Sequence, residues 1–93
     1  IYKDERGYFM ETRHEKKFAE AGIYFNFVQD NFSHSKQGIL RGLHYQVEKP
    51  QGKLVKALAG RIFDVAIDLR EDSPTFGQSV SVILSANNHY QLW

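Results

Sequence analysis

A histidine and a lysine on either side of a short turn are the residues of this chain best suited to chemistry. Residues 39–46, with His44, and the segment that begins at Lys53 are predicted as strands, and residues 47–52 as the turn between them. In an antiparallel hairpin the two side chains would lie nearly opposite each other, with Cβ atoms roughly 4.5–5.5 Å apart. A neutral imidazole beside an ammonium suits proton abstraction next to a carbonyl, because the cation stabilises the enolate that forms. The pair therefore predicts carbon-acid chemistry.

Length and composition indicate one small globular domain. The 93 residues are 42% hydrophobic and 14% aromatic, which is enough apolar material for a single core. Twelve basic against eleven acidic side chains leave a formal charge of +1, so neither nucleic acid nor an anionic membrane is predicted as a partner. There is no cysteine for disulfides or thiolate metal sites. Without a membrane-length apolar run or a visible signal peptide, a soluble cytoplasmic protein is expected.

The two ends of the sequence predict a fragment. The chain starts at Ile1 rather than at a methionine, and it stops at Trp93, a large aromatic at the end of a hydrophobic pattern. We therefore expect residues 1–93 to be the N-terminal and central part of a single domain that is truncated at its C-terminus.

Short apolar segments dominate the chain and predict an all-β fold. Thr12 and Glu15 have the spacing of a capping box, so a short helix is expected to follow Thr12, run through Ala21 and stop at Gly22. The longest strand is expected to break at Gly60, and turns are expected at residues 4–7 and 72–74. The strands predicted by alternation or by β-branched and aromatic content are 8–11, 23–31, 39–46, 53–69 and 79–85. Many short strands with one minor helix indicate a β-sandwich or barrel.

Alternation also predicts the faces of the two longest strands. In the first strand one apolar set shares a face: Phe63, Val65, Ile67 and Leu69. In the second strand the set expected to point inward is Val80, Val82 and Leu84.

Eight motifs along the chain together resemble one known family. In order they are DERGYF (4–9) with Glu11, FVQDN (27–31) with Ser33, LRGLHYQ (40–46), QGKLV (51–55), FDVAID (63–68), SPTFG (73–77), LSA (84–86) and QLW (91–93). Each motif alone is weak, but the ordered set resembles the dTDP-4-dehydrorhamnose 3,5-epimerase family of nucleotide-sugar enzymes.

The resemblance implies a fold, a reaction and a partner. The fold would be a cupin-type jelly roll, in a homodimer that exchanges N-terminal strand segments. The reaction would be epimerisation at C3 and C5 of dTDP-4-dehydro-6-deoxy-D-glucose to dTDP-4-dehydro-L-rhamnose, a step toward dTDP-L-rhamnose, with no metal or redox cofactor. The C4 ketone acidifies the protons at both carbons, so one base and one oxyanion partner can serve both centres.

The resemblance also implies site residues. It implies that His44 is the general base and that Lys53 contacts the sugar and the enolate. The other residues expected to line the substrate site are Gln29, Asp30, Asn31 and Arg41. Contacts to the nucleotide, often made from the partner subunit, are expected from Arg6 and Glu11. The family's proton-donating tyrosine, a second active-site histidine and the acidic residue that orients the base lie beyond the QLW stretch. The 93 residues are therefore expected to carry a base without its acid.

A metal site is not predicted, although one segment matches part of a known metal-binding motif. Gly38, five further residues and His44 copy the start of a cupin metal motif. The next ligand position holds Gln46, and the expected glutamate falls at Pro50 or Gln51. One ligand of three does not hold a first-row metal. The missing second histidine argues equally against the related sugar 3,4-ketoisomerases.

Alternatives stay open at this point. An epimerase acting at one carbon would use the same base and lysine, and a non-catalytic jelly roll could bind the sugar nucleotide without reaction. Judged by local pattern alone, His44 could be an ordinary strand histidine and Lys53 a solvated lysine. Strict alternation places Arg41 and His44 on opposite faces, so a shared pocket needs a bulge, for which Gly42 is suited.

Overall fold

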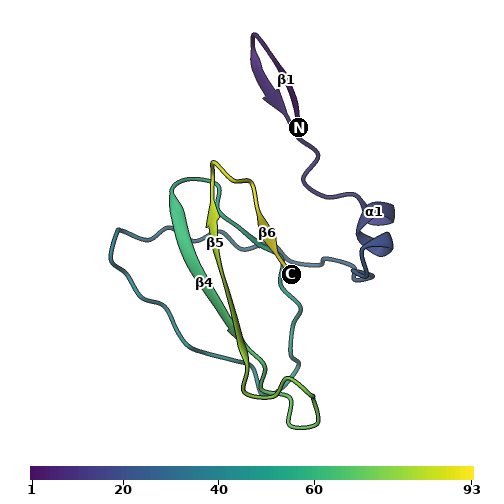
Figure 1. The fold of residues 1–93 in the computed structure, drawn as a ribbon, viewed down its shortest axis with the longest axis vertical. Helices are drawn as coiled ribbons and strands as arrows, with labels where there is room; N and C mark the ends of the chain where they lie inside the picture. Colours follow the sequence, from purple (N-terminus) through teal and green to yellow (C-terminus); the bar gives the residue numbers. More distant parts are fainter. The chain divides into compact units, whose positions relative to one another are not determined.

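Strands account for most of the regular structure in the computed structural model, which describes residues 1–93 (Figure 1). The elements are β1 (Tyr2–Asp4), β2 (Gly7–Phe9), α1 (Glu15–Glu20), β3 (Val55–Lys56), β4 (Arg61–Ile67), β5 (Ser79–Ser85) and β6 (Gln91–Leu92). They form three antiparallel pairs, β1–β2, β3–β6 and β4–β5. The expectation of short strands with one short helix is confirmed. The structure contains no helix with the length and apolar character needed to cross a bilayer.

The chain divides into two compact units, Ile1–Gly42 and Leu43–Trp93. The first unit begins with the β1–β2 hairpin, whose turn occupies residues 4–7 as predicted. Asp4 opens this turn by accepting a hydrogen bond from the Arg6 amide at 2.9 Å. Gly7 closes it with a φ of 129°, which suits a residue without a Cβ. Local turn chemistry therefore determines this hairpin.

The helix begins later than the capping-box pattern predicts, and that prediction is wrong. The N-cap is His14, whose Nδ1 accepts a hydrogen bond from the Lys17 amide at 3.5 Å. Glu15 is then the first helical residue, whereas a capping box needs its carboxylate at the third helical position. The helix stop is confirmed, because Gly22 follows the C-cap with a φ of 90° and donates to the Ala19 carbonyl at 3.0 Å.

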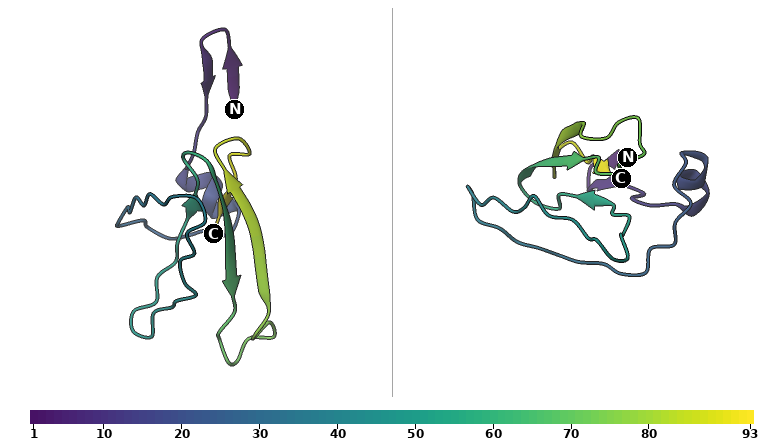
Figure 2. Two further views of the ribbon diagram at one scale, coloured as in Figure 1. Left: turned by 90° about the vertical axis from the view of Figure 1, so that its left-hand side faces the viewer. Right: turned by 90° about the horizontal axis from the view of Figure 1, so that it is seen from below.

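The second unit is built on the long β4–β5 hairpin, whose strands lie side by side (Figures 1 and 2). The break expected at Gly60 is confirmed, since β3 ends before it and pairs with β6 instead of extending β4. Directly opposed residues share a face, and the register opposes Leu84 to Ile62 and Val82 to Asp64. Leu84 is fully buried and forms the core of this unit, whereas Val80 is 64% exposed, so its predicted inward position is wrong.

The loop that joins β4 to β5 is organised around one carboxylate. Asp68 accepts hydrogen bonds from Arg70 Nε and Nη2 at 2.9 and 2.8 Å, from Ser73 Oγ at 2.6 Å and from Thr75 Oγ1 at 2.5 Å. Its carbonyl accepts from the Gly77 amide at 2.8 Å. These donors hold the pKa of Asp68 well below its ordinary value, with the Arg70 side chain as the largest cause. Asp68 therefore fixes the turn predicted at residues 72–74.

Replacing Asp68 with asparagine is expected to lower the melting temperature of the full-length protein and to flatten its dependence on acid pH. A lowered pKa in the folded state means that the carboxylate stabilises the fold above its ordinary pKa of 3.8 and that this stability is lost as the pH falls further. Thermal melts at neutral and acid pH measure both effects. Asp72→Asn, in the same loop, is the matched control, and equal shifts for the two variants would contradict the assignment.

Two predicted strands do not form. Residues 23–31 and 39–46 have no ladder of backbone hydrogen bonds, so the predicted hairpin between the histidine and lysine segments is wrong. The apolar residues of the second segment stay exposed, with Leu40 at 89% and Leu43 at 72%. Alternating apolar residues predict an extended segment, but a strand also needs a neighbouring backbone to pair with. Among residues 1–93 these segments do not find one.

Candidate functional site

The two residues predicted to do chemistry both lie in the second unit, on irregular backbone. His44 lies in the segment before the bend at residues 47–49, and Lys53 lies two residues before β3. Both are exposed. The bend falls within the turn predicted from the sequence, but the expected cross-strand pairing of the two side chains is absent, because residues 39–46 form no strand and Lys53 lies outside β3.

Gly42 adopts a φ of 101°, a backbone region that glycine enters far more readily than other residues. The backbone therefore leaves the strict extended alternation between Arg41 and His44 at the residue where the sequence suggests a bulge. A regular bulge of a β-ladder is not formed, because this segment has no strand partner.

In the first unit, the guanidinium of Arg6 is oriented by hydrogen bonds to a residue of its own turn. Its Nη2 and Nε donate to Asp4 Oδ2 at 2.6 and 3.2 Å. Donation from the Arg6 side chain is the main reason that the pKa of Asp4 is lowered. The Arg6 side chain nevertheless remains 91% exposed. Its remaining N–H groups can therefore meet a phosphate while Asp4 orients the guanidinium.

Glu11 is paired with a lysine that no motif in the sequence singles out. Lys17 Nζ lies 2.7 Å from Glu11 Oε1, and this hydrogen bond is the largest cause that lowers the pKa of Glu11. The same contact raises the pKa of Lys17. The spacing of the two residues carries no signal in the sequence, because Glu11 precedes the helix and Lys17 lies within it.

Gln29 and Asn31 are the two predicted site residues whose side chains the structure brings into direct contact. Gln29 Nε2 donates to Asn31 Oδ1 at 3.0 Å. Asp30, the residue between them in the chain, is exposed. The pair therefore presents a joined polar edge with donors and acceptors left for a ligand, which suits the hydroxyl groups of a sugar.

Arg41 is anchored by the polar loop that precedes it. Its Nε donates to Ser35 Oγ at 2.9 Å, and its Nη2 donates to the His34 carbonyl at 3.3 Å. Neither hydrogen-bond partner of Arg41 was identified from the sequence, because the polar residues of this segment predict a loop but no particular contact. The contacts restrict the rotation of a long side chain, which reduces the entropy that Arg41 would lose on binding an anion.

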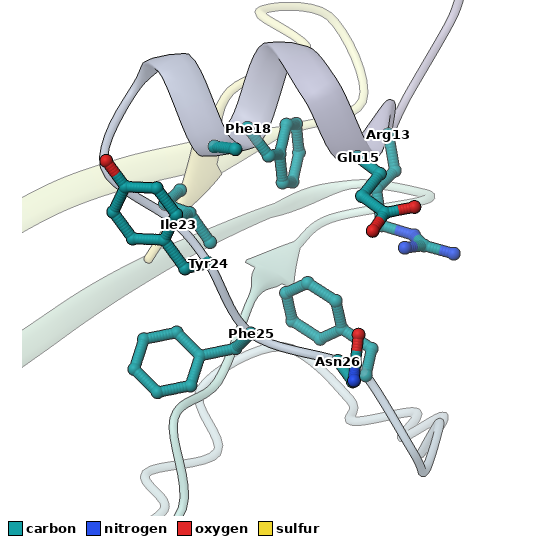
Figure 3. A pocket seen from close by; sticks show the side chains of 9 residues that line it. Arg13, Glu15, Phe18, Ile23, Tyr24, Phe25 and Asn26 are labelled. Carbon is teal, nitrogen blue, oxygen red and sulfur yellow. The ribbon is translucent and has the colours of Figure 1, made fainter.

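The first unit also contains a cavity of about 430 Å³ that none of the predicted site residues lines (Figure 3). Its walls come from α1 and the segment that follows it, and they include Phe18, Tyr24 and Phe25 (Figure 3). At its rim the Arg13 guanidinium lies 5.5 Å from the centre of the Phe27 ring, a cation–π distance. No three side chains of His, Asp or Glu gather anywhere in residues 1–93 as metal ligands would.

Comparisons with known proteins point to one family. A family model described as dTDP-4-dehydrorhamnose 3,5-epimerase matches residues 1–93. The protein of that name from Methanothermobacter thermautotrophicus is 56% identical over 93 residues, which are all of this chain and 50% of the relative.

Solved structures give the same result. The dTDP-6-deoxy-D-glucose-3,5-epimerase of Legionella pneumophila, in complex with dTDP-4-keto-L-rhamnose, is 60% identical with a TM-score of 0.91, over 98% of this chain and 49% of that one. The dTDP-4-dehydrorhamnose 3,5-epimerase of Bacillus anthracis, with TDP and PPi bound, is 46% identical with a TM-score of 0.91, over 97% of this chain and 53% of that one. The chain spans about half the length of the curated relatives that it matches.

Proposed function

Because the chain belongs to the dTDP-4-dehydrorhamnose 3,5-epimerase family, we propose that the protein epimerises dTDP-4-dehydro-6-deoxy-D-glucose at C3 and C5 to give dTDP-4-dehydro-L-rhamnose. The observation that carries the proposal is the match over 98% of this chain to an enzyme solved with dTDP-4-keto-L-rhamnose. The protein would act in dTDP-L-rhamnose formation as an isomerase without a cofactor. Its nucleotide-sugar substrate would be its small-molecule partner.

His44 is the proposed base. Its neutral imidazole takes the proton from C3 or C5, and the electron pair of the broken C–H bond moves through the C4 carbonyl to form an enolate. Lys53 supplies the positive charge that stabilises the enolate oxygen. Reprotonation from the opposite face of the sugar inverts the centre. The family resemblance assigns that proton to a tyrosine beyond the QLW stretch, outside residues 1–93.

The remaining site residues are proposed to hold the substrate. The joined amides of Gln29 and Asn31, with Asp30 and the anchored Arg41, would contact the sugar and its phosphates. Arg6 and Glu11 are proposed to contact the nucleotide. The exposed guanidinium of Arg6, oriented by Asp4, supports a phosphate contact, because arginine donates two parallel hydrogen bonds to phosphate oxygens.

We also propose that residues 1–93 belong to a single cupin-type jelly roll in a cytoplasmic homodimer that exchanges N-terminal strand segments. The β1–β2 hairpin supports the exchange, because Tyr2 and Phe9 are directly opposed in its register and are 75% and 71% exposed. Large apolar side chains gathered on a two-stranded hairpin need another surface to cover them.

The test of this function is proton NMR of dTDP-4-dehydro-6-deoxy-D-glucose in D₂O with the full-length protein. The C3 and C5 proton signals are both expected to disappear, because each carbanion is quenched by solvent-derived deuterium. Loss of one signal only would indicate a single-site epimerase instead. Retention of both signals, with binding of the nucleotide sugar, would indicate a non-catalytic binding module and would overturn the proposal.

A further inference from the structure

Trp93 packs its indole directly onto Gly52, the residue before Lys53. A Cβ placed on Gly52 would overlap Trp93 Cη2 and would lie 3.0 and 3.3 Å from Cζ2 and Cζ3. All three atoms belong to the six-membered ring of the indole. No atom larger than hydrogen therefore fits between the Gly52 backbone and Trp93.

The space taken by the indole, and not backbone conformation, explains the glycine at this position. The chain has seven glycines, and the six with a positive φ are Gly7, Gly22, Gly38, Gly42, Gly60 and Gly77. Those six occupy backbone regions that disfavour other residues. Gly52 is the one that does not, and a Cβ added to it would collide with a side chain, whereas a Cβ added to Gly7, Gly22, Gly38, Gly60 or Gly77 would meet nothing within 4 Å.

The strand register explains why the indole reaches this position. β3 and β6 oppose Val55 to Leu92 and Lys56 to Gln91, so continuing the register by one residue places Trp93 opposite Leu54. Gly52, two residues before Leu54, is then the diagonal neighbour of Trp93 on the same face, within reach of a long aromatic side chain. Lys53 lies between these two residues in the chain, directly after Gly52.

We propose that Trp93 is a positioning residue for Lys53, acting through the contact with Gly52; the part of this inference that concerns catalysis rests on the function proposed above. The exposed Lys53 side chain has four rotatable bonds, so the place of its ammonium depends first on where its backbone is held. The indole holds that backbone through its contact with Gly52. A displacement of about 1 Å at a catalytic group can lower the rate roughly a hundredfold.

The test is Gly52→Ala in the full-length protein. The added methyl group should push the backbone away from Trp93 and lower kcat by about tenfold or more, with a KM changed by less than about threefold. Trp93→Phe removes the six-membered indole ring that carries the colliding atoms. The double variant Gly52→Ala with Trp93→Phe should therefore recover part of the lost kcat.

The Lys53→Gln background separates positioning from general destabilisation. If Gly52→Ala acts through Lys53, it should lower kcat little further once Lys53 is gone, although its effect on the melting temperature should be the same in both backgrounds. An undiminished kcat loss in the Lys53→Gln background, or no recovery in the double variant, would overturn the inference. Full activity of Lys53→Gln itself would instead remove the proposed role of Lys53.

A second measurement holds even for a protein that does not catalyse. Reductive methylation with ¹³C-formaldehyde gives each lysine an NMR signal, and the Lys53 signal is the one missing from Lys53→Gln. Gly52→Ala should shift that signal, Trp93→Phe in the same chain should shift it back, and the Lys56 signal should move less. An unmoved Lys53 signal would overturn the positioning role independently of the proposed function.

Discussion

Replacing His44 with alanine is expected to abolish the exchange of the C3 and C5 protons of the sugar in D₂O. The imidazole is the group proposed to accept both protons, and removal of a positioned general base lowers a rate by roughly 10²–10⁴-fold. The measurement is the initial rate of signal loss in the proton NMR spectrum of the substrate with the full-length protein. Substrate binding, measured by calorimetry, should change far less than the rate, because a base contributes mainly in the transition state.

His34→Ala is the matched control for this experiment. It makes the same change of side chain in the exposed polar loop of the first unit, and it keeps the backbone carbonyl that accepts a hydrogen bond from Arg41. The control is expected to exchange both protons at the normal rate. If His44→Ala exchanges as fast as His34→Ala, then His44 is an ordinary exposed histidine and the base lies elsewhere.

Replacing Lys53 with glutamine is expected to lower kcat by roughly 10²–10³-fold while keeping the fold intact. An ammonium group aimed at the enolate oxygen stabilises charge that develops only in the transition state, and loss of one such group has an effect of this size. Since Lys53 is exposed on irregular backbone before β3, its replacement should leave the melting temperature almost unchanged. Steady-state kinetics and thermal melts together measure the prediction.

Lys56→Gln provides the comparison, because it makes the same change three residues further on, at an exposed position of β3 opposite Gln91. It should retain normal kinetics. Equal loss of activity in the two variants would show a general effect of positive charge on substrate attraction. Such an effect would weaken with added salt in both variants, whereas a specific contact of Lys53 with the enolate would persist.

Features that depend on neighbours in the chain could be predicted from the sequence. The turn at residues 4–7 follows from Asp4 and Gly7, and the helix stop follows from Gly22. Alternation predicts the two strands β4 and β5, and in the structure they pair with each other across the turn that joins them. The family could also be predicted from the sequence, since the resemblance depends on the order of eight motifs along the chain and not on their contacts in the folded protein.

Contacts between separated residues were not predictable in the same way. The pairing of Lys17 with Glu11 and the anchoring of Arg41 by Ser35 depend on where the backbone bends, which spacing alone does not state. The hairpin predicted for residues 39–55 is absent for a related reason. Alternation determines which residues favour an extended backbone, but hydrogen bonding to a second strand is decided by the rest of the fold.

The sequence by itself determined the family of this protein, its local turns and the residue types of the proposed site, His44 and Lys53 among them. The tertiary structure alone decided what surrounds them. Gly52 lies neither in a turn nor at a positive φ that would require glycine. The requirement for glycine becomes clear only in the folded chain, where the β3–β6 register brings Trp93 into contact with Gly52. Packing between distant residues is a property of the folded backbone, because it depends on distances that a linear pattern does not contain.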